Sequence, residues 1–325
     1  FSLTLMSCHA ELFSEEMPVR RLDSWWGKSM KSVLKPNDAQ ASVTGFVPCF
    51  SQEKIIRFVG DLPAMPHIAA QIMQKLASSD STPQEIHELI TNDQSLAARV
   101  LKIANSPYYG ASRSISSIKE AIIFMGFDSI SSLIMTAVMK DMFSTVSDAG
   151  RRMWEHSICC AVAAKHIGGA LGLQSLEEAF LAGLMHDIGK SVLFLQVPDK
   201  MRDVVLLVSG GKSFWDSERE LLGFTHAEVG RLLTQKWRFT LTMEEVVANH
   251  HEPDYVGSAR QLAHIVSLAN SLCHKLSLGL TMRPAIDPYE LESTKALGLG
   301  APVISRTLKL LAETETVSSA EKGEQ

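Results

Sequence analysis

Cysteine is scarce in this chain, and the cysteines present do not follow the spacing of a disulfide framework or of a thiolate metal site. Their number is odd and no Cys-x-x-Cys pair occurs among them. We therefore expect reduced thiols in a reducing compartment. The five are Cys8, Cys49, Cys159, Cys160 and Cys273.

Long hydrophobic runs are also lacking. No stretch of about 18 uncharged apolar residues is available for a membrane-spanning helix. The first residues carry Glu11, Glu15 and Glu16, where a secretory signal has a basic start followed by an apolar stretch. These two features predict a cytoplasmic protein with no membrane partner.

Positive charge is not concentrated anywhere along the chain. Lysine and arginine together number 31 against 36 for aspartate and glutamate, so the formal net charge is −5 at pH 7. Without a dense basic block, the sequence disfavours a nucleic-acid partner. With 46% hydrophobic and 21% charged residues, the composition is that of a folded soluble protein.

Apolar residues recur at helical spacing through most of the chain, and no alternating stretch is long enough to predict a strand. Two helix starts are marked by capping boxes, one at Thr82–Glu85 with a proline at the first helical position and one at Ser117–Glu120. Met125-Gly126-Phe127 indicates a break between two further helices. We predict an all-α fold.

The sequence divides into four parts. Residues 1–50 show no sustained period and are left as an N-terminal extension without an assigned function. Residues 51–145 form an N-terminal helical part, and residues 146–280 form a second bundle of longer helices. Residues 281–325 add C-terminal helices and a tail from about Thr314, rich in Glu, Thr and Ser, which we expect to be mobile.

Histidines are concentrated in the second bundle, where eight of the eleven lie between His156 and His274. A single histidine on a helix is more often packed than a ligand, but here several fall at predicted helix ends, where side chains converge. Imidazole and carboxylate groups without thiolate suit iron, manganese or zinc. An aspartate beside a histidine can also bridge two ions, as two-metal hydrolysis of phosphate esters requires. The grouped residues are His156, His186, Asp187, His226, His250 and His251.

Together these motifs resemble the HD superfamily of metal-dependent phosphohydrolases, and more specifically its HDOD branch, the HD-related output domains of bacterial signalling. The resemblance covers roughly residues 55–280. The superfamily match rests on His156, the stretch from His186 to Lys190, His226, and His250-His251-Glu252-Pro253. The HDOD match rests on Leu62-Pro63-Ala64-Met65-Pro66 and on the helix from Val100 that ends in Asn105-Ser106-Pro107-Tyr108-Tyr109-Gly110.

The resemblance implies a distorted HD-type helical bundle with an N-terminal helical subdomain, in a bacterial regulatory protein. It implies one or two divalent ions, iron or manganese, held by His156, His186, Asp187, His250 and His251, with His226 as a sixth ligand. Asp187 and Lys190 would be the catalytic residues, because Lys190 would face a substrate phosphate and neutralise its charge. His166, His264 and His274 are expected to be structural.

Two positions depart from the enzymes of this superfamily. Asn270 stands where HD enzymes place a late aspartate, and a neutral amide binds hard cations more weakly. Arg152 stands where the trinuclear cyclic-dinucleotide phosphodiesterases place an acidic residue, and their Gly-Tyr-Pro signature is absent. These departures predict weak catalysis or none.

Three functions therefore remain open. The first is a signal-transduction protein that keeps its metal site and acts through contacts with a signalling protein or a second copy of itself. The second is a metal-dependent phosphohydrolase acting on a nucleotide or another phosphoester. The third is a helical scaffold whose histidines bind nothing.

Two further polar stretches of the sequence can be interpreted. Asn105, Tyr108 and Tyr109 are interpreted either as a turn that completes the core or as a regulatory interface, because polar-tipped rings suit a surface that meets both water and protein. The run Glu218-Arg219-Glu220 is interpreted as the solvated face of a helix.

Overall fold

The computed structural model describes residues 55, 62–76, 82–105, 113–143, 148–281 and 285–320. All of them belong to one compact unit that spans residues 47–325. The described residues form α-helices joined by turns, and no strand occurs among them. The prediction of an all-α fold is confirmed.

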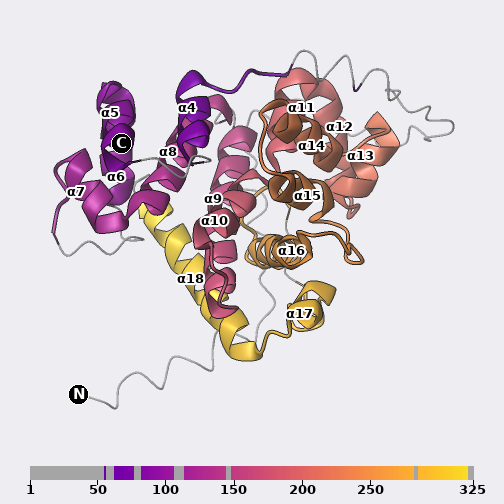
Figure 1. Cartoon of the computed structure of the whole chain (residues 1–325). Helices are drawn as coiled ribbons and strands as arrows, with labels where there is room; N and C mark the ends of the chain where they lie inside the picture. The colour runs from indigo at the N-terminus through magenta and orange to yellow at the C-terminus, as the bar shows by residue number, and fades with distance from the viewer. Residues whose placement is uncertain are drawn as a thin grey trace. The chain divides into compact units, whose positions relative to one another are not determined.

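The N-terminal helical part is built around one long helix, α8, against which α4, α6 and α7 pack (Figure 1). The predicted caps are present, since Thr82 and Glu85 form a reciprocal capping box and the Ser117 side chain accepts the Glu120 N–H. The helices are α4 (His67–Leu76), α5 (Pro83–Thr91), α6 (Gln94–Ala104), α7 (Ile118–Met125) and α8 (Phe127–Phe143).

The second part packs around α9, which is lined by α10, α16 and α18. Helix α14 lies between α11 and α15 and contacts both. The helices are α9 (Asp148–Ala170), α10 (Leu176–Met185), α11 (Ile188–Gln196), α12 (Pro198–Ser209), α13 (Phe214–Leu222), α14 (His226–Lys236), α15 (Leu241–Asn249), α16 (Arg260–Lys275), α17 (Glu292–Leu297) and α18 (Ala301–Ala320).

The larger of two hydrophobic clusters in the described residues runs through both parts, from Ile55 to Leu311, and the smaller one lies between α9 and α10. Polar contacts add to the larger cluster where α14 ends. The Lys236 ammonium donates to the Leu62 carbonyl at 2.8 Å, and the Trp237 indole donates to the Pro63 carbonyl at 3.1 Å. These bonds anchor the segment before α4 on the second part.

The C-terminal helix is longer than the sequence suggested. Helix α18 continues past Thr314 to Ala320, so this stretch of the expected mobile tail is helical. None of the helices in the described ranges combines the length and apolarity that crossing a bilayer requires.

Asn105 ties the end of α6 to the segment that leads into α7. Its side-chain amide donates to the carbonyls of Leu101 and Ile115, both at 2.8 Å, and its oxygen accepts the Ile115 N–H at 2.7 Å. The polar side chain therefore joins α6 to the segment before α7, a use that does not depend on an interface. Tyr108 and Tyr109 lie outside the described residues, and their part in an interface stays a prediction.

Candidate metal centre

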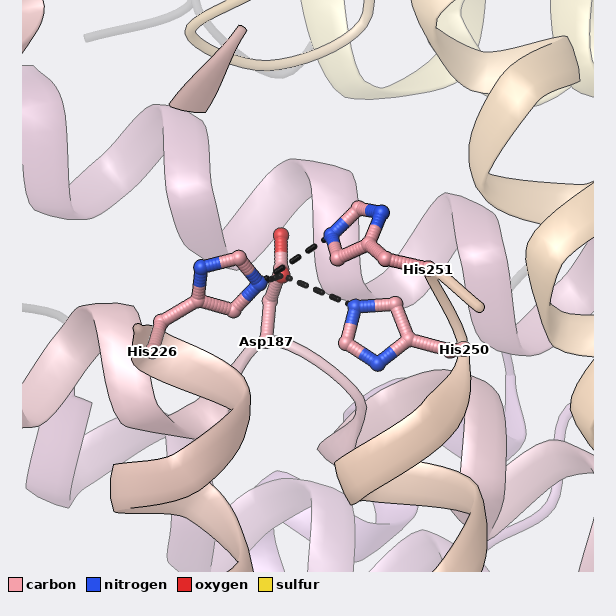
Figure 2. A group of neighbouring side chains, drawn as sticks. All are labelled: Asp187, His226, His250 and His251. Atoms are coloured by element: carbon pink, nitrogen blue, oxygen red, sulfur yellow. Dashed lines mark hydrogen bonds and ion pairs between the residues drawn. The ribbon is translucent and has the colours of Figure 1, made fainter. Parts of the chain in front are cut away.

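The predicted ligands come together where several helices begin or end. His186 caps the C-terminus of α10 and Asp187 follows it directly, before α11 starts. His226 is the first residue of α14, and His250 caps the C-terminus of α15. Figure 2 shows Asp187 among the imidazoles of His226, His250 and His251. His156, from within α9, completes the group on the other side of Asp187.

Asp187 is the common neighbour of these imidazoles. Its Oδ1 lies 3.2 Å from Nε2 of His226 and 3.7 Å from Nε2 of His250. Its Oδ2 lies 3.4 Å from Nε2 of His186 and 3.6 Å from Nε2 of His156. Two ligand groups therefore share this one carboxylate: His156, His186 and Asp187 form one, and Asp187, His226, His250 and His251 form the other.

Hydrogen bonds at Nδ1, the ring nitrogen that points away from Asp187, fix the tautomers of three of these histidines. Nδ1 of His156 lies 2.9 Å from the Leu278 carbonyl, Nδ1 of His186 lies 2.7 Å from the Gly183 carbonyl, and Nδ1 of His250 lies 2.9 Å from the Val247 carbonyl. A carbonyl can only accept, so each Nδ1 carries the proton. In the neutral ring, Nε2 is then left with a lone pair that faces Asp187.

This arrangement leaves polar atoms without partners. Within the described residues, Nε2 of His186 and of His250 finds no hydrogen-bond partner. Their lone pairs face Asp187 carboxylate oxygens 3.4 and 3.7 Å away with no proton between them. A divalent cation bound at about 2.0–2.2 Å from nitrogen and oxygen would fill that gap. The residues present therefore fit a metal site.

Lys190 supplies positive charge at the same place. Its buried ammonium donates to Asp187 Oδ2 at 2.7 Å and lies 4.7 Å from the centre of the Phe214 ring. In this arrangement Lys190 neutralises the aspartate itself. Facing a phosphate, as the resemblance implies, requires the ammonium to exchange this partner for another.

Glu218 belongs to the site, and the interpretation of its surroundings as a solvated face is wrong for this residue. Its side chain is 0% exposed, and Oε2 accepts both the backbone N–H of His226 at 2.8 Å and the ring Nδ1–H at 2.6 Å. A carboxylate in this position orients the imidazole and increases its basicity. The spacing in the sequence did indicate burial, because Glu218 lies on the same helix face as Phe214 and Leu221, which are buried.

Arg152 does not place its charge against the ligands. Its guanidinium donates to the carbonyl of Gly279, next to the Leu278 carbonyl that accepts from His156. Gly279 has φ +116°, and a Cβ there would lie 3.0 Å from Nδ1 of His156. Two features favour glycine here: a backbone conformation that other residues rarely adopt, and the imidazole packed against the position of a Cβ.

Gly189, in the stretch after Asp187, allows α11 to approach the start of α14. A Cβ on Gly189 would lie 1.9 Å from the carbonyl oxygen of His226. No side-chain rotation relieves an overlap with backbone, so a side chain here would push α11 away from α14 and separate Asp187 from His226.

A cavity of about 100 Å³ opens beside the cluster. Lys190, Trp215, His251 and Asn270 are among its lining residues. The Asn270 Oδ1 is buried and has no partner in the part of the chain that the structure describes. His274 also lines the cavity, and its ring stacks on that of His156 with centroids 5.1 Å apart. The sequence predicts only a structural role for His274, but the residue adjoins the site.

The remaining histidines lie apart from the ligand groups. His166 Nδ1 hydrogen-bonds with the Thr307 hydroxyl at 2.9 Å, which joins α9 to α18, and His264 is buried in α16. Among the described residues, neither belongs to a group that could hold a metal ion.

Burial and charge set the protonation of the cluster. Burial lowers the pKa of His156 to about 4 and that of His250 to about 3, so both rings are neutral at pH 7. Burial, the largest single effect, also lowers the pKa of His226. The charge and hydrogen bond of Glu218, together with the hydrogen bond to Asp187, outweigh it, so the net shift is upward. For Asp187, burial raises the pKa, yet His186 and Lys190 beside it hold the pKa well below the ordinary value.

Comparison with known proteins places these features in a family. A model of the HDOD domain matches residues 62–253, more than half of the chain. The crystal structure of an HDOD domain protein of unknown function from Geobacter sulfurreducens is 28% identical, with a TM-score of 0.68 over 83% of this chain and 96% of that one.

Two further solved structures share the fold at lower identity. A proposed phosphohydrolase from Shewanella amazonensis is 22% identical, with a TM-score of 0.66 over 81% of this chain and 94% of that one. A proposed signal transduction protein from Marinobacter aquaeolei is also 22% identical, with a TM-score of 0.67 over 86% of this chain and 62% of that one.

Two curated proteins resemble the chain in sequence. An uncharacterised protein from Treponema pallidum is 23% identical over 217 residues, 65% of this chain. Ribonuclease Y from Thermus thermophilus is 26% identical over 184 residues, 54% of this chain. The matched parts span 42% and 27% of the lengths of these relatives.

Changing Glu218 to Gln tests its support of His226. The amide removes the negative charge from the Nδ1–H partner, so we expect metal affinity to fall about 10–100-fold, the usual cost of losing such a partner. Isothermal titration with Mn²⁺ measures it. Glu220→Gln is the matched control, because Glu220 lies on the same helix and pairs with Lys212 instead. Equal affinities in all three proteins would contradict the role.

The metal-free protein should lose stability as the pH falls. The pKa values of His156 and His250 are lower in the folded state than the ordinary value of 6.5, so the unfolded chain takes up protons first. The stabilisation is complete above about pH 6.5 and is lost as the pH falls towards 4, by on the order of 2 kcal/mol per ring down to about pH 5. His226, with its raised pKa, opposes part of this loss.

Urea unfolding of chelator-treated protein across this pH range measures the effect. In His250→Gln the slope should be shallower, because one buried neutral ring is gone. A free energy of unfolding that stays level down to about pH 5 would show that these rings are not held neutral.

Proposed function

The chain belongs to the HDOD domain family, and we propose that it is a regulatory protein of bacterial signal transduction that retains a divalent-metal centre and acts mainly through protein contacts. The observation that carries the metal centre is the set of Nε2 lone pairs that face the buried Asp187 carboxylate. Without a cation these buried acceptors repel one another, and the low dielectric constant of the interior makes that repulsion costly.

The two ligand groups suit two ions that share Asp187. His156 and His186 would hold one ion with Oδ2, and His226, His250 and His251 would hold the other with Oδ1. Ligands that are only nitrogen and oxygen favour iron or manganese, with zinc as an alternative. Ions in this position would polarise a phosphoryl oxygen and lower the pKa of a bound water.

Three features favour regulation over rapid catalysis. Asn270 offers only a neutral amide to the cavity, and Lys190 is engaged with Asp187. On the N-terminal part, α7 exposes Ile123 at 74% and Phe124 at 48%. Neighbouring exposed apolar side chains suit contact with a signalling protein or with a second copy of this chain.

A metal-dependent phosphohydrolase is the second candidate, and the cavity beside the cluster favours it. Lys190 and His251 lie on its wall together with hydroxyl and amide groups, so a phosphoester entering it would meet a cation, hydrogen-bond donors and the metal ligands at once. Lys190 would neutralise charge on the phosphoryl oxygens after leaving Asp187, and Trp215 offers an aromatic face to the rest of a nucleotide.

Metal content tests the proposal. We expect protein purified without chelator or added metal to contain between one and two divalent ions per chain. Asp187→Asn should lose them more completely than His226→Gln, because Asp187 supplies charge to both groups. His166→Gln, on α9 but outside the cluster, is the control and should keep its metal. Elemental analysis that finds well under one ion per chain, unchanged after reconstitution, would contradict the proposal.

Turnover distinguishes the two candidates. Metal-loaded protein should hydrolyse a panel of phosphomonoesters, cyclic mononucleotides and cyclic dinucleotides slowly or not at all, and Asn270→Asp should bind metal more tightly. Rapid metal-dependent hydrolysis that Lys190→Ala abolishes would make the phosphohydrolase the primary function.

A further inference from the structure

Two buried thiols lie directly beside the centre, form a second group of metal-ligand side chains with His156, and take no part in the proposed function. Cys160 on α9 and Cys273 on α16 are each 0% exposed, and both adjoin His156. No sequence pattern marks this group, because the two thiols come from helices more than 100 residues apart and lack Cys-x-x-Cys spacing.

The distances in this set suit ligands of one ion. His156 and Cys160 are four residues apart on α9, so they share one face of the helix, and His156 Nε2 lies 3.5 Å from Cys160 Sγ. In a tetrahedral site with Zn–N about 2.0 Å and Zn–S about 2.3 Å, nitrogen and sulfur are about 3.5 Å apart. The Cys160 thiol also hydrogen-bonds with that of Cys273, and the three donor atoms lie within 4.8 Å of one another.

The charge balance favours a divalent ion. Two thiolates, one neutral imidazole and a 2+ ion sum to zero, which suits a position inside the hydrophobic cluster to which both cysteines belong. Sulfur ligands select thiophilic ions such as Zn²⁺ over Mn²⁺. Binding would release one proton from each thiol to the solvent, as thiolate coordination requires.

His156 can serve only one ion at a time, because its Nε2 has one lone pair. That nitrogen is 3.5 Å from Cys160 Sγ and 3.6 Å from Asp187 Oδ2, so the two ligand groups compete for it. We propose that His156, Cys160 and Cys273 form a site for a thiophilic divalent cation such as Zn²⁺, whose occupation withdraws His156 from the ion held with His186 and Asp187. The withdrawal rests on the proposed metal centre, whereas the thiol site does not.

Cobalt absorption tests the thiol site by itself. The full chain, stripped of metal and kept reduced with a phosphine, is titrated with Co²⁺, which gives intense near-ultraviolet charge-transfer bands only when thiolate is bound. We expect this band in the unaltered protein and its loss in Cys160→Ser and in Cys273→Ser. Cys159→Ser is the matched control, since Cys159 is the buried neighbour of Cys160 outside the group, and it should keep the band.

The cobalt band also tests the competition. Excess Mn²⁺, which does not displace Co²⁺ from thiolate by itself, should weaken the band of the cobalt-loaded unaltered protein and of Cys159→Ser, because it claims His156 for the ion held with His186 and Asp187. In Asp187→Asn, which lacks the shared carboxylate of the centre, the band should stay unchanged. Electron paramagnetic resonance verifies that the Mn²⁺ is bound. Circular dichroism verifies that each variant is folded, and the alanine substitutions at 160 and 273 replace any serine variant that is not.

The outcomes separate the two claims. A titration without a charge-transfer band, or a band that survives in both Cys160→Ser and Cys273→Ser, would overturn the thiol site. A cobalt band in the unaltered protein that bound Mn²⁺ leaves unchanged would overturn the competition. If Mn²⁺ does not bind at all, the proposed metal centre fails, while the cobalt band still decides the thiol site.

Discussion

The rest of the site depends on one constraint, which is a buried carboxylate faced by the unprotonated nitrogens of several imidazoles. Asp187 is ionised, and the rings of His156 and His250 are neutral at pH 7 because burial lowers their pKa values. The backbone carbonyls of Leu278 and Val247 hold the proton of each ring on the side away from Asp187. In a low-dielectric interior, acceptors that face one another in this way repel, and a cation between them would stabilise the arrangement.

The fold meets this constraint by bringing helix ends together. His186 and His250 cap the C-termini of α10 and α15, and His226 begins α14. Close backbone contact at Gly189 sets α11 against α14. Lys190 and Glu218 act around this arrangement, one as a cation on Asp187 and the other as the acceptor for His226. The same packing places the thiols of α9 and α16 next to His156.

Much of this was predictable from local pattern, and the exceptions share a physical cause. Apolar period and capping residues located the helices, and the motifs placed His186 and His250 at helix ends. Glu218 was misjudged because a run of charges suggested a solvated face, although its position on the apolar face of α13 indicated burial. The bond from His156 to the Leu278 carbonyl and the pairing of Cys160 with Cys273 join residues far apart in sequence, which only tertiary packing reveals.

The most direct test of the account is the anomalous scattering of a crystal of the manganese-loaded protein, recorded on both sides of the manganese absorption edge. Two peaks are expected to flank the Asp187 carboxylate, one near His156 and His186 and the other near His226, His250 and His251. The absence of an anomalous peak beside either oxygen of Asp187, with Lys190 as the only cation in contact with it, would contradict the proposed metal centre.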